Sequence, residues 1–211
     1  MRVKHFILVA ALVLAGCGGG ITAYKIVGYD DQIKSGWDEY NRNRFDEAYQ
    51  LFIGARNMDD ERPEAYIGCG WSLLMRQHPD SAIVEFFRGS DYLTTPGDSL
   101  DSICGISGSY LAKGDNVRTI NFLKPYDFDY LEQAFPLKNH DFFLDRGDLE
   151  MVFAQSYYRL GIYSAAEGAD PNNATYHLNQ VLLTPYTYTN SEELMDKMTG
   201  YLSGTQGGFK R

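Results

Sequence analysis

From about residue 30 onward, apolar residues recur every three or four positions among polar ones, which is the period of an amphipathic α-helix. The pattern predicts four helices in the first half of the chain, at about 30–43, 45–57, 63–76 and 80–92. Pro63 and Pro79 fall in the first turns of two of these helices, where a missing backbone N–H costs little. The pattern therefore favours a helical fold over most of the chain.

The same hydrophobic pattern returns after 34 residues. The pairs at this offset are Gly36 with Gly70, Trp37 with Trp71, Ala48 with Ala82, Phe52 with Phe86, and Ala55 with Gly89. The chain thus resembles the tetratricopeptide repeat, which has this length and an A-x3-F element like that of Ala48 with Phe52. The resemblance implies units of two antiparallel helices. Small residues would lie where helices cross closely, and each Phe would fill the hole towards the next unit.

Later units are less regular. A third unit has a first helix that begins at about Asp98, with Gly105 one residue beyond the period, and a second helix from Asn116 to Leu123. A fourth unit has a first helix at 148–166 and a short second helix at about 174–183. A last helix, at 191–203, is expected to begin with Asn190 or Ser191 as its cap. The resemblance implies an all-α fold: a short, right-handed, tetratricopeptide-like solenoid of antiparallel helix pairs with a C-terminal capping helix. It would span 29–204, with units at about 29–62, 63–96, 97–124 and 147–183, an insertion at 125–146 and a disordered tail at 205–211.

The first residues follow a different pattern, because basic Arg2 and Lys4 precede an apolar run that is too short to span a bilayer. This run leads directly into Cys17 and resembles the bacterial lipobox. The resemblance implies a signal peptide at 1–16, lipidation of Cys17 and a flexible tether over 17–28. Gly18, rather than Asp, follows the cysteine, so we expect a lipid anchor in the bacterial outer membrane, with the protein facing the periplasm. A buried cysteine in an ordinary signal peptide or signal anchor is the alternative.

The net charge of the chain excludes two classes of partner. Loss of residues 1–16 would remove two basic residues and no acid, so the charge would change from -9 to -11. Nucleic acids and anionic lipid surfaces both require clustered Lys and Arg. We therefore expect no nucleic-acid partner, and membrane contact only through the lipid.

Candidate catalytic and metal-binding residues are sparse. His78, His140 and His177 lack the spacing of metal ligands, and the acidic group at 127–132 does not match a calcium-binding loop. The segment Gly105–Ser109 misses the nucleophile-elbow pattern at its last residue. We expect no enzyme activity, no cofactor and no metal.

Cys69 and Cys104 occupy nearly equivalent positions on neighbouring units. Packed helices are about 8–10 Å apart, whereas bridged cysteines need Cα atoms within about 7 Å of each other. Two buried thiols are therefore expected rather than a disulfide.

The family resemblance implies a concave groove lined by the first helices of successive units. The expected groove residues are Ile33, Trp37, Tyr40, Asn41, Ile67, Trp71, Leu74, Met75, Tyr110, Tyr158 and Arg159. Such a groove suits a helix or extended segment of an envelope protein, which predicts a protein-binding scaffold that serves outer-membrane assembly or secretion. The alternatives are a groove filled by the chain's own ends, and a receptor that binds a glycan or small ligand through the groove or the insertion.

Overall fold

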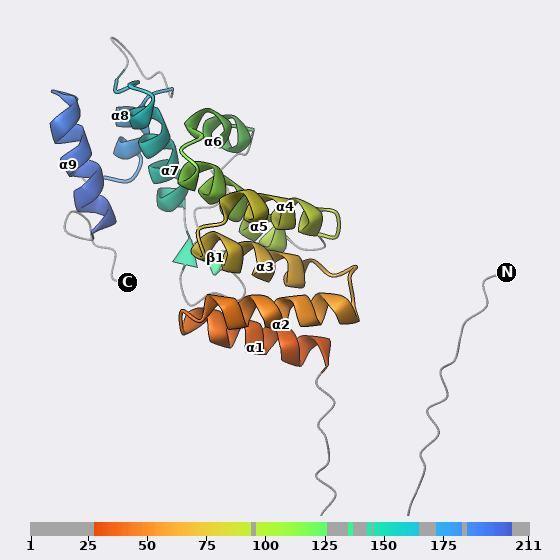
Figure 1. Cartoon of the computed structure of the whole chain (residues 1–211). Coiled ribbons are helices and arrows are strands. Elements are labelled where there is room, and N and C mark those ends of the chain that lie inside the picture. The colour runs from red at the N-terminus through yellow and green to blue at the C-terminus, as the bar shows by residue number, and fades with distance from the viewer. Residues whose placement is uncertain are drawn as a thin grey trace, which may run out of the picture.

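The structure is a computed structural model that describes residues 28–93, 96–125, 135–136, 143–144, 146–164, 172–182 and 185–203. These residues form nine α-helices, and from α1 to α8 the helices that follow one another in the sequence pack side by side (Figure 1). The predicted all-α fold is confirmed for this part of the chain. One small antiparallel ladder, β1 (Phe135–Pro136) with β2 (Phe143–Leu144), falls within the expected insertion.

The first six helices lie close to their predicted positions. They are α1 (Tyr29–Asn41), α2 (Phe45–Met58), α3 (Pro63–Met75), α4 (Pro79–Ser90), α5 (Pro96–Ala112) and α6 (Asn116–Leu123). The turns after α1 and α3 are alike, because Asn43 and Gln77 both have a left-handed backbone, with φ of 60° and 63°. In both turns, the next residue donates its N–H to a carbonyl five residues earlier, Arg44 to Glu39 and His78 to Leu73. The period of 34 is therefore present in the backbone as well as in the sequence.

The helices meet around two buried phenylalanines. The ring of Phe52, on α2, lies against Gly36 of α1 and Gly68 of α3. The ring of Phe86, on α4, lies in the same way against Gly70 of α3 and Gly105 of α5. A Cβ atom at any of these glycines would come within 3 Å of the ring. The expected role of the small residues and of both phenylalanines is confirmed, and we call these two contacts the phenylalanine junctions.

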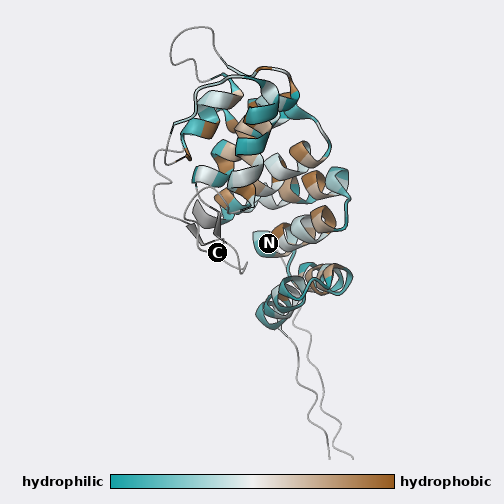
Figure 2. Cartoon of the chain, turned by 90° about the vertical axis from the view of Figure 1, so that its left-hand side faces the viewer, coloured by the Kyte–Doolittle hydropathy of each residue, from teal (hydrophilic) through white to brown (hydrophobic). Residues whose placement is uncertain are grey.

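Helix α3 lies at the centre of this part of the molecule, since it contacts α1, α2, α4 and α5. All its residues from Ala65 to Leu73 are buried. Hydrophobic and hydrophilic residues are mixed on most helices in Figure 2, as expected for amphipathic elements that bury one face.

The C-terminal part is less regular and departs from prediction at two helix ends. Helix α7 (Arg146–Arg159) stops well before residue 166, and Gly161 has a left-handed φ of 76° where the chain turns away. Helix α8 (Ala174–Asn179) is also shorter than predicted. Helix α9 (Ser191–Leu202) lies alongside α7, and the predicted cap is confirmed, because the side chain of Asn190 accepts the N–H of Glu193 at 2.9 Å.

Candidate functional site

The predicted groove residues divide into a buried set and a surface set. Ile33, Trp37, Tyr40, Ile67 and Trp71 are buried, whereas Asn41, Leu74, Tyr110 and Tyr158 are partly exposed and Met75 and Arg159 are exposed. The two tryptophans are only 4% and 7% exposed. The prediction that they line an open groove for a partner is therefore wrong.

The tryptophans are buried because they pack on the phenylalanine junctions. The ring of Trp37 meets that of Phe52 edge to face, with centroids 4.9 Å apart, and the ring of Trp71 meets that of Phe86 at 5.6 Å. The indole Nε1 of Trp71 also donates a 2.5 Å hydrogen bond to the buried carboxylate of Asp101. Neighbouring first helices contact each other here, so a side chain on this face fills the space between helices instead of facing solvent.

The surface members of the predicted groove lie near the C-terminal ends of their helices, α1, α3, α5 and α7. Arg159 reaches from α7 to the end of α5, where its Nη1 donates to the carbonyl of Leu111 at 3.1 Å. The ring of Tyr110 lies 6.2 Å from that of Phe122. These residues mark one edge of the helical stack and do not form a single apolar stripe with the tryptophans.

Three aromatic rings from different helices form a surface feature that shares only Tyr110 with the predicted groove. Phe87 of α4 and Tyr110 of α5 each lie 6.2 Å from Phe122 of α6. We call these three residues the aromatic ridge. Phe87 is 45% exposed, and Val84, one turn earlier on α4, is 48% exposed. The repeat contained a signal for this, since Val84 replaces the polar Gln50 at the equivalent position of the first unit.

Buried carboxylates were also missed. Glu85 contacts Arg56 and Arg88, and it stands where the first unit has Leu51. In the C-terminal part, an oxygen of Glu150 lies 2.6 Å from the imidazole Nδ1 of His177. Glu85 could have been identified from the sequence, because it is a charged residue at a position that is apolar in the first unit.

The pair of Glu150 and His177 joins α7 to α8. The imidazole stacks on Phe153 at 4.5 Å and on Tyr157 at 5.4 Å, while Arg146 donates to the other oxygen of Glu150 at 3.4 Å. Both members of the pair are less than 9% exposed. The arrangement is a core contact that holds two helices together.

Cys69 and Cys104 are buried free thiols, as predicted. Burial raises the pKa of the Cys69 thiol to about 12 and raises that of Cys104 as well. A thiol that stays protonated at neutral pH is a poor nucleophile and metal ligand. Both cysteines therefore contribute to packing.

The part of the chain that the structure describes contains no group of three or more His, Cys, Asp and Glu side chains that could hold a metal ion. Within the same residues, every helix is too short or too polar to cross a membrane. Cys17, the predicted signal peptide and tether, and the predicted tail at 205–211 lie outside the described residues.

No family model, curated protein or solved structure matches this chain.

Proposed function

We propose that this protein is a lipid-anchored scaffold of the bacterial envelope, built as a short, right-handed tetratricopeptide-like solenoid, that binds another envelope protein. The recurrence of the phenylalanine junction supports the solenoid. Phe52 and Phe86 are 34 residues apart and contact glycines in the same way, and the turns at Asn43 and Gln77 repeat at the same distance. Folds of this kind bury a continuous core between repeats and leave long surfaces for partners.

The location of the scaffold rests on the sequence around Cys17. A thioether-linked lipid at this residue would hold the body at the outer membrane, on the periplasmic side, and the glycines that follow would separate it from the surface. The acidic body favours contact with the membrane through the lipid alone.

The aromatic ridge is the surface that best suits a protein partner. Aromatic side chains carry much of the binding energy in protein interfaces, and contiguous exposed apolar groups commonly mark such sites. Phe87 and Val84 project from one face of α4 beside Phe122. An apolar segment of the partner would cover this face, while polar residues around it would form the rim.

Two experiments test the proposal. Cys17→Ser should move the protein from the membrane to the soluble fraction, and unchanged membrane association would contradict the anchor.

For the ridge, Val84→Ser with Phe87→Ser should abolish cross-linking to the partner in intact envelopes and leave the melting temperature nearly unchanged.

A matched control for the ridge is Met58→Ser with Met75→Ser, because these two side chains are exposed to a similar extent but lie elsewhere. Equal loss of cross-links in both double variants would show that binding is not confined to the ridge. Retained cross-links in the Val84 and Phe87 variant would exclude the ridge as the binding surface.

A further inference from the structure

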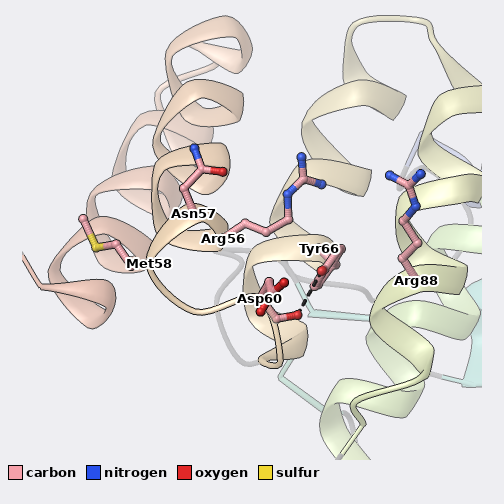
Figure 3. Close-up of a pocket in the computed structure, with 6 residues that line it drawn as sticks. All are labelled: Arg56, Asn57, Met58, Asp60, Tyr66 and Arg88. Atoms are coloured by element: carbon pink, nitrogen blue, oxygen red, sulfur yellow. Dashed lines mark hydrogen bonds between the residues drawn. The ribbon is translucent and has the colours of Figure 1, made fainter. Parts of the chain in front are cut away.

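A pocket of about 450 Å³ opens between α2, α3 and α4 (Figure 3). It is lined by Arg56, Asn57, Met58, Asp60, Tyr66 and Arg88. This volume lies within the range of about 300–1,000 Å³ that is usual for small-ligand sites. None of the aromatic ridge residues lines this pocket, and the inference drawn from it does not depend on the proposed scaffold function.

One side of the pocket is cationic. Arg56 and Arg88 point the same way in Figure 3, and each donates through Nη1 to a different oxygen of Glu85, at 2.7 and 3.3 Å. Glu85 is only 7% exposed, so this buried carboxylate fixes the positions of both guanidinium groups. A guanidinium has five N–H donors, and further donors on each arginine can therefore meet a ligand.

The opposite side of the pocket is anionic. Asp60 belongs to the lining and is flanked in the loop between α2 and α3 by two more exposed acids, Asp59 and Glu61. The hydroxyl of Tyr66 donates to the backbone carbonyl of Asp60 at 2.9 Å and holds this loop against α3. The Tyr66 hydroxyl is protonated at neutral pH, as in any tyrosine, and burial raises its pKa further.

An aromatic surface and an apolar side chain lie beside these charges. The ring of Tyr66 stacks on that of Tyr92 with centroids 5.7 Å apart, and the guanidinium of Arg56 lies 5.4 Å from the centre of the Tyr66 ring. Met58 is 51% exposed at the rim. Met58 can therefore contact the apolar part of a small ligand, while Tyr66, packed between Tyr92 and Arg56, forms the buried wall behind it.

We propose that this pocket binds a small zwitterion, a free amino acid or a short peptide with free ends. Glu85 offsets part of the charge of Arg56 and Arg88, and Asp60 lies on the lining apart from this cluster, so the pocket has separate positive and negative sides. Such a site suits one carboxylate facing the arginines and one ammonium group facing Asp60. A polyanion is disfavoured because it would also meet both carboxylates.

Isothermal titration with a set of four related dipeptides tests this assignment. The probes are L-alanyl-L-leucine, its N-acetyl form, its C-terminal amide, and the form blocked at both ends. We expect the free dipeptide to bind most tightly, each single block to weaken binding about tenfold or more, and the doubly blocked form not to bind. Free L-leucine, run alongside, distinguishes an amino-acid site from a peptide site.

Two exposed lining residues allow the two sides to be tested separately without disturbing the core. Arg88→Gln should weaken binding of the free and N-acetyl dipeptides about tenfold and leave the C-terminal amide unaffected, because only the first two carry a carboxylate. Asp60→Asn should weaken the free dipeptide and the C-terminal amide, and leave the N-acetyl form unaffected. Arg118→Gln, on α6 and paired with Asp115, is the control and should change nothing.

Three results would overturn the proposal. They are no binding of the free dipeptide or of leucine at millimolar concentration, equal binding of free and blocked dipeptides, and equal effects of Arg88→Gln on all four probes. Since none of these measurements involves a protein partner or the membrane, their failure would leave the proposed scaffold function untouched.

Discussion

The contact that recurs in the N-terminal part of the molecule and the contact that joins α7 to α8 in the C-terminal part use different chemistry. From α1 to α5, the phenylalanine junctions bring an apolar ring against glycines on both neighbouring helices. Between α7 and α8, the contact is polar and directional, with the imidazole of His177 held by Glu150 and stacked on Phe153. The first kind needs only space of the right shape, whereas the second needs fixed donor and acceptor positions.

This difference explains why the repeat is visible in one part of the chain and lost in the other. A phenylalanine junction needs only one large and two small residues, so it can recur in each unit. The repeated residues then appear in the sequence at a fixed spacing. The polar contact between Glu150 and His177 joins residues 27 positions apart and occurs once. It therefore produces no repeated spacing in the sequence. Regular spacing is therefore evidence of apolar packing, and its loss does not mean that packing has stopped.

The largest effect is expected when both tryptophans of the N-terminal part are truncated. Trp37 and Trp71 each pack on a junction phenylalanine, and replacing a buried aromatic residue with Ala costs about 3–5 kcal/mol. Trp37→Ala with Trp71→Ala should therefore unfold the protein or lower its melting temperature severely, as followed by circular dichroism. A double variant that melts like the wild type would mean that both indoles are surface groups after all.

Phe86→Ala comes next, because it empties one junction without touching the other. The expected loss is about 3–5 kcal/mol in the free energy of unfolding, measured by urea denaturation. Phe87→Ala is a neighbouring control with an exposed ring, and we expect it to cost less than about 1 kcal/mol. Similar losses for the two variants would contradict the 34-residue register.

The polar junction is tested by His177→Phe, which keeps an aromatic ring for stacking but removes the imidazole contact to Glu150. Since Glu150 is buried, loss of this contact should cost about 1–3 kcal/mol. Adding Glu150→Leu should restore part of the loss, because it removes a buried carboxylate that, among the described residues, keeps only the 3.4 Å contact with Arg146 once the imidazole is gone. If the free-energy losses of His177→Phe and of Glu150→Leu simply add in the double variant, the two residues act independently.

Substitutions at two glycines of α5 distinguish the effect of tight packing from the effect of helix propensity. A Cβ at Gly105 would clash with the Phe86 ring, whereas one at Gly108 would lie 3.7 Å from Leu74, an ordinary contact. Gly105→Ala should therefore destabilise by about 1–3 kcal/mol through overpacking. Gly108→Ala should stabilise by about 0.5–1 kcal/mol, because Ala favours the helix. If both variants change the melting temperature equally, the Phe86 ring can move to accommodate the added methyl group.

The smallest effect concerns pH and belongs to the N-terminal part alone. Cys69 and Cys104 have thiol pKa values raised by burial, so the contribution of the neutral thiols is fully present well below the ordinary thiol pKa of about 8.5 and decreases as pH rises above it. At pH 9.5 we expect a loss of about 1 kcal/mol per thiol. Melting temperatures at pH 8 and 9.5 should differ less in a variant with Cys69→Ala and Cys104→Ala. An identical difference in the variant would assign the pH effect to other groups.

How far the sequence could predict this molecule depends on the residue. The helix positions and the role of Phe52 and Phe86 follow from periodicity, because both depend on the size and spacing of residues within one unit. The burial of Trp37 and Trp71 could not be predicted in this way. The 34-residue spacing shows that the two positions are equivalent, but it does not show how closely the next helix packs against them. The end of α7 at Arg159 was missed because the apolar spacing continues after Gly161 while the backbone turns.

The candidate sites were harder to predict than the fold. Glu85 unites Arg56 and Arg88, which are 32 residues apart, and only the stacking of α2 and α4 on α3 brings them together. The aromatic ridge likewise combines rings from α4, α5 and α6. Contacts between units depend on the packing of whole helices, which no local pattern describes.

Each phenylalanine junction is shared by two helix pairs, and this has a consequence for how the N-terminal part comes apart. Phe52 belongs to α2 but also fills the surface of α3, so detaching the first pair would expose both a ring and the glycine face that received it. Phe86 ties α3 to α5 in the same way. The loss of one pair thus weakens the next, as in chains whose stability depends on nearest-neighbour coupling. We expect α1 to α5 to open as a single cooperative unit instead of fraying one pair at a time.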